Sequence, residues 1–257
     1  MTLLLLAPRI NETGLQLLTR ARFRGLTAHT ATRWEAPEWL AELRPAHLYG
    51  GPLFADVVAG VLGVAPLEPP DDWLTTLPRE LLGRQVTVTT LAEARGLRRP
   101  AFLKPPNDKL FAARVHPDGS GLPGPDALDD DTPVLVSDVV TFATEYRLFV
   151  LDGTVRAASR YAVGGDLAVS PEVPPAALAF AAEVLATGGL PSAAVVDVGQ
   201  LADGSWAVVE ANPAWASGGY ACDPDAVLDV VLRAAGPAES LTPADRRYVR
   251  PLPEVVR

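Results

Sequence analysis

One stretch of the sequence decides the fold: Val195–Asn212, which reads VVDVGQLADGSWAVVEAN. Two runs rich in β-branched residues flank the dipeptide Asp203-Gly204, which is the strongest short signal for a β-hairpin. The residues that alternate with the acids are apolar, so one face of this hairpin is suited to a core. We therefore expect two antiparallel strands whose other face carries the chemistry.

A two-residue turn at this dipeptide fixes the register of the hairpin. It places Gly199 opposite Val208 and Asp197 opposite Glu210, with Asn212 two residues further along the same face. Like charges directly opposite each other destabilise a sheet, so we expect a positive group against this face. Two carboxylates and an amide oxygen suit Mg²⁺ that bridges to nucleotide phosphates. The alternative is a solvated acidic pair on an exposed edge.

A second hairpin is indicated within Ser137–Tyr161, where Asp152-Gly153 is again a two-residue turn signal. The resulting register places Glu145 opposite Arg160. One face then carries one acid and three arginines, namely Glu145, Arg147, Arg156 and Arg160. Guanidinium groups suit the oxygens of phosphates and carboxylates, so this face predicts an anion site. The alternative is a surface ladder of ion pairs that contributes little energy.

The only two lysines of the chain, Lys104 and Lys109, lie five residues apart at the end of an expected strand. A lysine at a strand end can reach a phosphate as a compact charge, although an ordinary surface lysine is the alternative. The sequence contains neither a P-loop nor a dinucleotide-binding glycine fingerprint. A bound nucleotide therefore needs a different cradle.

The composition is that of an acidic globular protein. The chain has 257 residues, a formal net charge of −9, 48% hydrophobic and 21% charged residues. The acidic balance argues against a nucleic-acid partner, because binding to the phosphate backbone needs a basic surface. Cys222 is the single cysteine, and the three histidines are too widely spaced for a zinc site. No apolar stretch reaches membrane-spanning length, so the cytoplasm is the expected location.

The order of the expected elements predicts three regions. Alternating short strands and helices indicate a small α/β domain over residues 1–84, and paired antiparallel strands follow over 85–236. Residues 237–257, rich in proline and charge, are expected to form an extended tail. The Gly/Pro/Asp-rich loop Pro117–Pro133 is either a lid over the site or a surface excursion.

Taken in order, these segments resemble the ATP-grasp superfamily, and most closely its clade named for one arginine and two lysines. The segments are Phe102–Pro105 with Lys109, Val134–Val140, Glu145–Arg147, Val196–Gly199 and Glu210–Pro213, and Pro8–Gly14 is also similar. The resemblance covers most of the chain. It implies an α+β ATP-grasp fold, in which two α+β subdomains grip ATP, preceded by a small N-terminal α/β domain.

The resemblance also implies a role for each side chain. The nucleotide contacts are Lys104 and Lys109 at the α- and β-phosphates, the hinge Ser137, Asp138, Val139 and Val140 at the adenine, and Glu145 at the ribose. The ligands of one or two Mg²⁺ are Asp197, Glu210 and Asn212. Arg147 and Arg160 are the expected catalytic residues, which stabilise the transferring phosphoryl group.

The function implied is an ATP-dependent carboxylate–amine ligase that works through an acyl-phosphate with ATP and Mg²⁺ as cofactors. Its expected partners are a small carboxylic acid and an amine, including amino acids or a peptide, and neither nucleic acid nor membrane. Two alternatives stay open: a regulatory ATP-binding module without ligation, and a phosphotransferase on the same fold. The sequence leaves the oligomeric state open.

Overall fold

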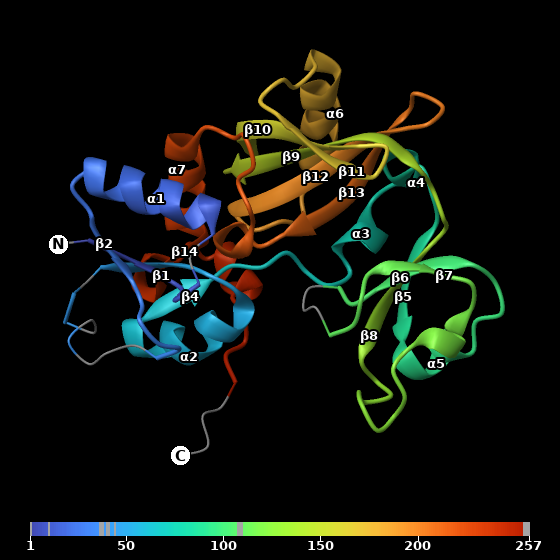
Figure 1. Cartoon of the computed structure of the whole chain (residues 1–257), viewed down its shortest axis with the longest axis horizontal. Coiled ribbons are helices and arrows are strands. Elements are labelled where there is room, and N and C mark those ends of the chain that lie inside the picture. Colours follow the sequence, from blue (N-terminus) through green and yellow to red (C-terminus); the bar gives the residue numbers. More distant parts are fainter. Residues whose placement is uncertain are drawn as a thin grey trace.

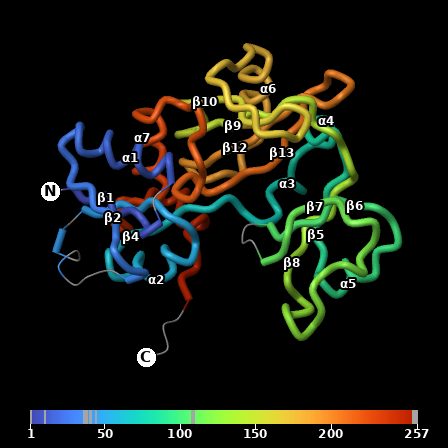
Figure 2. Tube along the Cα trace, in the orientation of Figure 1, coloured from blue at the N-terminus to red at the C-terminus, as the bar shows by residue number. Residues whose placement is uncertain are grey.

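The computed structural model describes residues 2–9, 11–35, 39, 42–43, 45–106 and 110–253. These residues form an N-terminal α/β part, a small lobe around a four-stranded sheet and a larger part around a five-stranded sheet (Figure 1). The Cα trace in Figure 2 passes through these parts in that order and then returns to the N-terminal part. In the described part of the chain, no helix is long and apolar enough to cross a membrane.

The N-terminal part is built on a parallel sheet in the order β2-β1-β3. Its elements are β1 (Leu3–Leu6), α1 (Glu12–Phe23), β2 (Thr27–Thr30), β3 (Ala46–Tyr49) and α2 (Pro52–Leu62). All four leucines of β1 are buried, as expected for a strand covered on both faces. Asn11 caps α1 by accepting a hydrogen bond from the N–H of Gly14 at 2.7 Å.

The small lobe is an antiparallel sheet in the order β5-β8-β6-β7. Its elements are β5 (Val86–Thr90), α5 (Leu91–Arg95), β6 (Ala101–Lys104), β7 (Arg114–His116), the 3₁₀ helix η2 (Gly119–Gly121) and β8 (Pro133–Ser137). The loop Pro117–Pro133 packs against α5, where Arg95 donates to the Pro123 carbonyl at 2.8 Å and pairs with Asp130. These contacts favour the surface excursion over the lid.

The larger part is an antiparallel sheet in the order β11-β10-β9-β12-β13. Its strands are β9 (Phe142–Leu151), β10 (Thr154–Val163), β11 (Asp166–Ser170), β12 (Ala193–Leu201) and β13 (Trp206–Asn212). Helix α6 (Pro175–Ala186) packs on one face, and α7 (Pro224–Ala234) packs on the other face together with the N-terminal sheet. The short helices α3 (Trp73–Thr76) and α4 (Arg79–Leu82) join the core beneath α6.

In the carboxylate hairpin, β12–β13, Asp197 lies opposite Glu210 as predicted, but the turn and the register that bring them together differ from those expected. Gly204 takes a left-handed φ of 87° at the end of a loop that is longer than the expected two-residue turn. The expected pairing of Gly199 with Val208 is therefore wrong. A bulge beside the two acids shifts the register back, so that the acids meet after all.

The arginine hairpin, β9–β10, has the expected two-residue turn at Asp152-Gly153, with φ of 50° and 72°. Two bulges beyond the turn then shift the register twice. Arg160 therefore lies opposite Tyr146 instead of Glu145, on the face of the sheet that α6 covers. The expected face of three arginines does not form, because each bulge turns the following side chains over.

The C-terminal segment runs back over the body of the molecule. It contains β14 (Ala235–Pro237), paired with β4 (Val64–Pro66), and the 3₁₀ helices η4 (Ala238–Ser240) and η5 (Asp245–Tyr248). Arg250 pairs with Asp56 at 2.7 Å and with Glu68 at 2.9 Å, which fastens the segment to the N-terminal part. The division at 84/85 and 236/237 stays a proposal, since α7 shares one core with the N-terminal sheet.

Candidate active site

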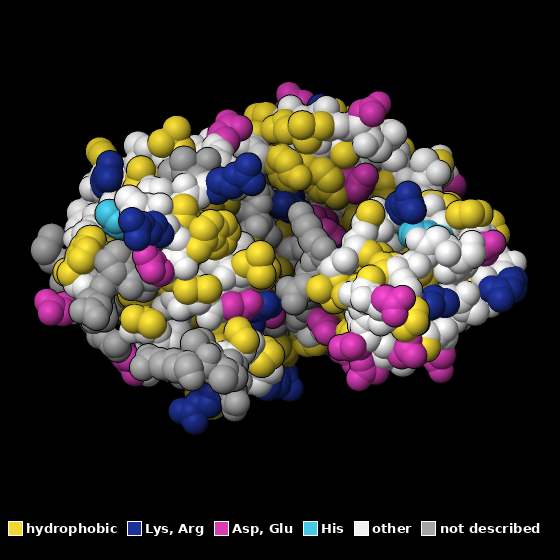
Figure 3. All heavy atoms as spheres, turned by 60° about the horizontal axis from the view of Figure 1, so that its bottom comes forward, with side chains coloured by type: hydrophobic (Ala, Val, Ile, Leu, Met, Phe, Trp, Pro, Cys, Tyr) yellow, Lys and Arg dark blue, Asp and Glu magenta, His cyan; other side chains and the backbone are white. Residues whose placement is uncertain are grey.

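A pocket of about 220 Å³ lies between the small lobe and the five-stranded sheet. Its apolar walls include Leu74, Val86, Phe102, Leu135, Phe142 and Val209, and its polar lining includes Arg84, Lys104, Glu145, Glu210 and the segment Ser137–Val140. Figure 3 shows the surface hollowed between the lobe and the body of the molecule. A slot with apolar walls and a few converging polar groups is typical of a ligand site.

The segment Ser137–Val140 crosses from one sheet to the other, because β8 ends at Ser137 and β9 begins at Phe142. The N–H of Asp138 donates to the Gln85 carbonyl at 3.0 Å, and the Asp138 carboxylate accepts from the N–H of Gln85 at 3.1 Å. These two bonds fasten the crossing to the chain that enters the lobe. The position suits a hinge, and its contact with adenine stays a prediction.

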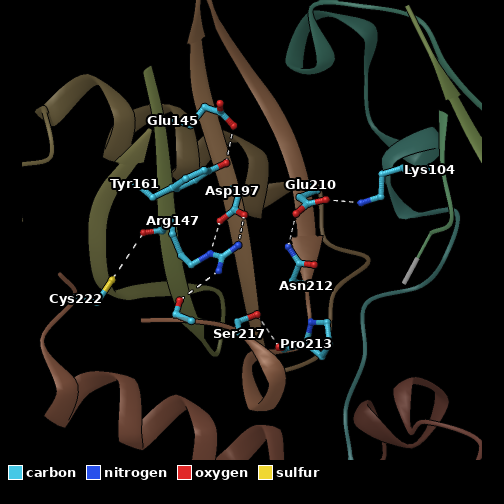
Figure 4. A network of polar contacts seen from close by, with 11 residues as sticks. Lys104, Glu145, Arg147, Tyr161, Asp197, Glu210, Asn212, Pro213, Ser217 and Cys222 are labelled. Carbon is cyan, nitrogen blue, oxygen red and sulfur yellow. Dashed lines mark hydrogen bonds and ion pairs between the residues drawn. The ribbon is translucent and has the colours of Figure 1, made fainter. Parts of the chain in front are cut away.

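Arg147 and Asp197 form a buried ion pair in the middle of the sheet (Figure 4). The Arg147 guanidinium donates to both carboxylate oxygens, at 3.0 Å and 2.6 Å, and its third nitrogen donates to the Gly218 carbonyl at 3.3 Å. Complete burial raises the pKa of the Asp197 carboxyl, and the Arg147 charge acts in the opposite direction. Arg147 is thus the positive group that offsets this acid.

Lys104 and Glu210 form a second pair, which joins the small lobe to β13 (Figure 4). Asn212 donates from its amide nitrogen to the other carboxylate oxygen of Glu210 at 2.8 Å. Burial acts to raise the pKa of Glu210, but the charge and hydrogen bond of Lys104, with the Asn212 bond, hold it below its usual value. Each of these two cations is therefore matched with an expected metal ligand.

The donor set of this site fits a hard divalent cation only in part. Glu210 lines the pocket, Asn212 lies beside it, and both offer oxygens of the type that Mg²⁺ prefers. Both oxygens of Asp197 are held by Arg147. Among the described residues, no three His, Cys, Asp or Glu side chains are grouped as a metal site. Both oxygens of Glu210 are held as well, by Lys104 and Asn212. Each carboxylate can therefore bind the ion only once its cation, Lys104 or Arg147, releases it.

Sequence reasoning missed Tyr161, which a bulge in β10 turns toward the site. Its hydroxyl donates to Glu145 at 2.6 Å, and its ring stacks on Tyr220 with the centroids 5.2 Å apart. The Arg147 guanidinium lies 5.6 Å from the Tyr161 centroid and 5.0 Å from that of Tyr220. Burial, with the nearby carboxylates, raises the pKa of Tyr161, so the hydroxyl stays a donor. Only the bulge reveals this residue, and the sequence gives no signal for it.

Sequence reasoning also missed Arg84, a buried guanidinium at the entrance to β5. It donates to the Ser137 hydroxyl at 2.9 Å and to the carbonyls of Val208 and Val209 at 2.6 Å and 3.0 Å. It therefore links the hinge of the small lobe to β13, which carries Glu210. Burial lowers the pKa of Arg84 to about 10. A positive charge held in this way beside a pocket suits an anionic ligand.

Arg160 is the expected site residue that the described structure places away from the pocket and from the two ion pairs. The Arg160 guanidinium donates to the Ala168 carbonyl of β11 at 3.1 Å, on the other face of the sheet from Arg147. Its predicted catalytic role has no geometric support here. Lys109 lies outside the described residues, so its predicted phosphate contact stays a prediction.

Known structures share this architecture over most of the chain. D-Alanine–D-alanine ligase from Bacillus anthracis matches with a TM-score of 0.57 at 14% identity, over 91% of this chain and 97% of its own. D-Cycloserine synthetase DcsG matches with a TM-score of 0.53 at 16% identity, over 90% and 98%. A RimK-domain ATP-grasp protein from Sphaerobacter thermophilus DSM 20745 matches with a TM-score of 0.50 at 16% identity, over 90% of this chain and 100% of its own. At these identities the likeness establishes the fold.

The family follows from the sequence itself. No curated protein sequence matches the chain. One family model matches residues 81–230, which hold the hinge, both hairpins and both ion pairs, and it describes an ATP-grasp domain of family 2 in the clade named for one arginine and two lysines. The expected ATP-grasp fold is thereby confirmed, and the chain belongs to family 2 of that clade of ATP-grasp domains.

Proposed function

We propose that this protein is an ATP-dependent carboxylate–amine ligase, which forms an amide through an acyl-phosphate and releases ADP and phosphate. One observation carries the proposal: Lys104 and Glu210, which line the pocket between the two sheets, are paired with each other, and a second cation–carboxylate pair, Arg147 with Asp197, lies on the neighbouring strands β9 and β12. Paired charges of this kind can exchange their partners for phosphate oxygens and a metal ion when a nucleotide binds.

The pocket has a region suited to each part of ATP. The apolar walls suit adenine, and the hinge lies beside them. Glu145, which accepts from Tyr161, would also accept from the ribose hydroxyls. Lys104 and Arg84 supply positive charge for the phosphates. Mg²⁺ would be held by Glu210 and Asn212, joined by Asp197, and would neutralise phosphate charge during transfer.

The substrate carboxylate is a weak electrophile, so it must be activated before an amine can attack it. An oxygen of the substrate carboxylate attacks the γ-phosphorus of ATP, and the bond from that phosphorus to ADP breaks. The amine then attacks the acyl carbon, and phosphate leaves with the bonding electrons of the carbon–oxygen bond. Arg147 would stabilise the negative charge of the transferring group, since its guanidinium presents a fork of donors that now binds Asp197.

The first substrate class to test is the amino acids. Two proteins of similar fold are named D-alanine–D-alanine ligase and D-cycloserine synthetase. Their names motivate the choice, since the fold itself does not define a substrate. Small peptides, which carry the same carboxylate and amine groups, are the next class to test.

The test is ADP release from Mg-ATP in the presence of amino acids, dipeptides and other small carboxylic acids, with and without added amines. The proposal expects ADP release that depends on the acid, together with a product of the mass of the amide. Tight ATP binding without stimulated release would contradict ligation and favour a binding module. A stable phosphorylated product without amide would favour a phosphotransferase.

A further inference from the structure

A second cavity, also of about 220 Å³, lies in the N-terminal part at the carboxyl ends of β1 and β3. The chain places β2 on one side of β1 and β3 on the other, so the direction of winding changes between β1 and β3. Ligands of open parallel sheets bind at such a switch point, outside the carboxyl ends of the strands. The cavity therefore occupies a position where a ligand is expected on general grounds.

The walls of this cavity define the chemistry of its ligand. Of the described residues that line it, Arg9 alone is charged, and none is acidic. Trp34 is 51% exposed and yet held in place edge-on against the ring of Phe54, with the centroids 5.8 Å apart. Tyr49 supplies a second aromatic ring. An arginine fork beside aromatic surface suits a carboxylate that is attached to an apolar or aromatic group.

The cavity is joined to the candidate active site by direct hydrogen bonds. Tyr49, on its wall, donates from its hydroxyl to the Ser217 carbonyl at 3.0 Å. Thr13 accepts from the N–H of Gly219 at 2.7 Å. Between these two anchors, the Gly218 carbonyl accepts from Arg147 at 3.3 Å. The wall of the cavity and Arg147, the candidate catalytic arginine, thus contact the same loop, residues 217–219.

The same loop carries a sign of functional constraint. Tyr220, which stacks on Tyr161, is one of the two non-glycine residues in the described chain with positive φ, at 48°. Such a conformation is strained for a side chain of this size and persists where the surroundings impose it. The contacts of Thr13 with Gly219 and of Tyr49 with Ser217 hold the residues directly before Tyr220, between the cavity and Arg147.

We propose that this cavity holds the amine substrate, and that this substrate is an α-amino acid with an apolar or aromatic side chain. Its carboxylate pairs with Arg9 and its side chain packs on Trp34. Arg9 lines this cavity, whereas Lys104 and Arg84 line the nucleotide pocket, so a carboxylate held at Arg9 is not the group that is activated. The amino group then attacks the carbon of the acyl-phosphate, the carbon–oxygen bond to phosphate breaks, and the departing phosphate takes the proton that the amine loses. This assignment rests on the proposed ligase function.

The test is isothermal titration calorimetry on the full chain, loaded with ADP and Mg²⁺, with L- and D-phenylalanine and leucine. The matched probes are phenylalaninamide and leucinamide, which lack the carboxylate. We expect at least one amino acid to bind, and its amide to bind about tenfold more weakly. Arg9→Ala should lower the affinity for the amino acid to that for its amide, and Trp34→Ala should lower the affinity for both.

The control is Arg33→Ala, which removes an exposed arginine that pairs with Glu35 on the same stretch of chain. It should leave binding unchanged, and thermal unfolding should show that all three variants fold. Equal binding of amide and acid, no effect of Arg9→Ala, or no binding by any probe would overturn the assignment. Amino-acid binding without any ligation would instead refute the ligase function, and the cavity would remain an amino-acid binding site.

Discussion

At the scale of single residues, the candidate site is a set of charges that satisfy one another. Lys104 holds Glu210, and Arg147 holds Asp197, so the cations expected to bind phosphate already have anionic partners. A buried charge without a partner is costly, and each pair removes that cost from the nucleotide-free protein. It follows that the binding of nucleotide and the binding of metal should be coupled, because each frees a group that the other needs.

Glu210→Gln tests this coupling. The change keeps the shape of the side chain and removes the charge that holds Lys104, which then becomes free for phosphate. We expect ADP to bind about fivefold more tightly than to the wild type when Mg²⁺ is removed with EDTA, and we expect Mg²⁺ no longer to improve binding. Calorimetry measures both, with the exposed Glu183→Gln as control. Weaker ADP binding by the variant without Mg²⁺ would contradict the exchange.

Lys104→Ala tests the same pair through the pH dependence of stability. The pKa of Glu210 is lower in the folded protein than in the unfolded chain. The ion pair therefore stabilises the fold fully at a pH above the unfolded-state pKa, and this stabilisation is lost as the pH falls through the folded-state pKa. We expect the variant to be about 2 kcal/mol less stable at pH 7. Urea unfolding should show the difference shrinking below about pH 4. A difference that stays constant down to about pH 3 would contradict the ion pair as its cause.

Arg84→Ala tests whether this residue joins the hinge to β13. Its loss leaves the carbonyls of Val208 and Val209 without their donor, and we expect the free energy of unfolding to fall by about 3 kcal/mol. Arg84→Lys keeps the charge but not the fork, so it should regain part of the stability. The exposed Arg79→Ala serves as the control. Equal stability of Arg84→Ala and this control would show that the link is unimportant.

At the scale of elements, both hairpins were predictable and their registers only in part. The Asp-Gly signals located the turns, but turn chemistry does not determine bulges further along a strand. In the carboxylate hairpin the longer loop and the bulge offset each other, and Asp197 met Glu210 as predicted. In the arginine hairpin two bulges accumulated, which moved Arg160 away and brought Tyr161 in.

The turn of the arginine hairpin supports a prediction that concerns the backbone alone. Gly153 has a φ of 72° with open space around it, so Gly153→Ala adds conformational strain and no clash. We expect a loss of about 1 kcal/mol, because the left-handed region is unfavourable for an L-residue. Gly124 is equally open without a positive φ, and Gly124→Ala should therefore change stability little. Urea unfolding of the two variants distinguishes them, and equal losses would contradict the turn geometry.

At the scale of the whole molecule, the sequence predicted the fold class because the order of its segments is specific to one superfamily. Long-range contacts could not be predicted in the same way. Arg84 binds Ser137 and Val208, which lie 53 and 124 residues away, and Thr13 binds Gly219 across 206 residues. No local pattern encodes such partners. These contacts join parts of the chain that lie far apart in the sequence and side by side in the fold (Figure 1).

The transfer of oxygen from the carboxylate to phosphate tests the central claim most directly. A carboxylic acid that stimulates ADP release is labelled with ¹⁸O in its carboxylate, and the phosphate formed with Mg-ATP and amine is analysed by mass spectrometry. An acyl-phosphate predicts that each phosphate carries one labelled oxygen, because the carbon–oxygen bond breaks when the amine attacks. Unlabelled phosphate, or label in AMP released with pyrophosphate, would contradict the mechanism.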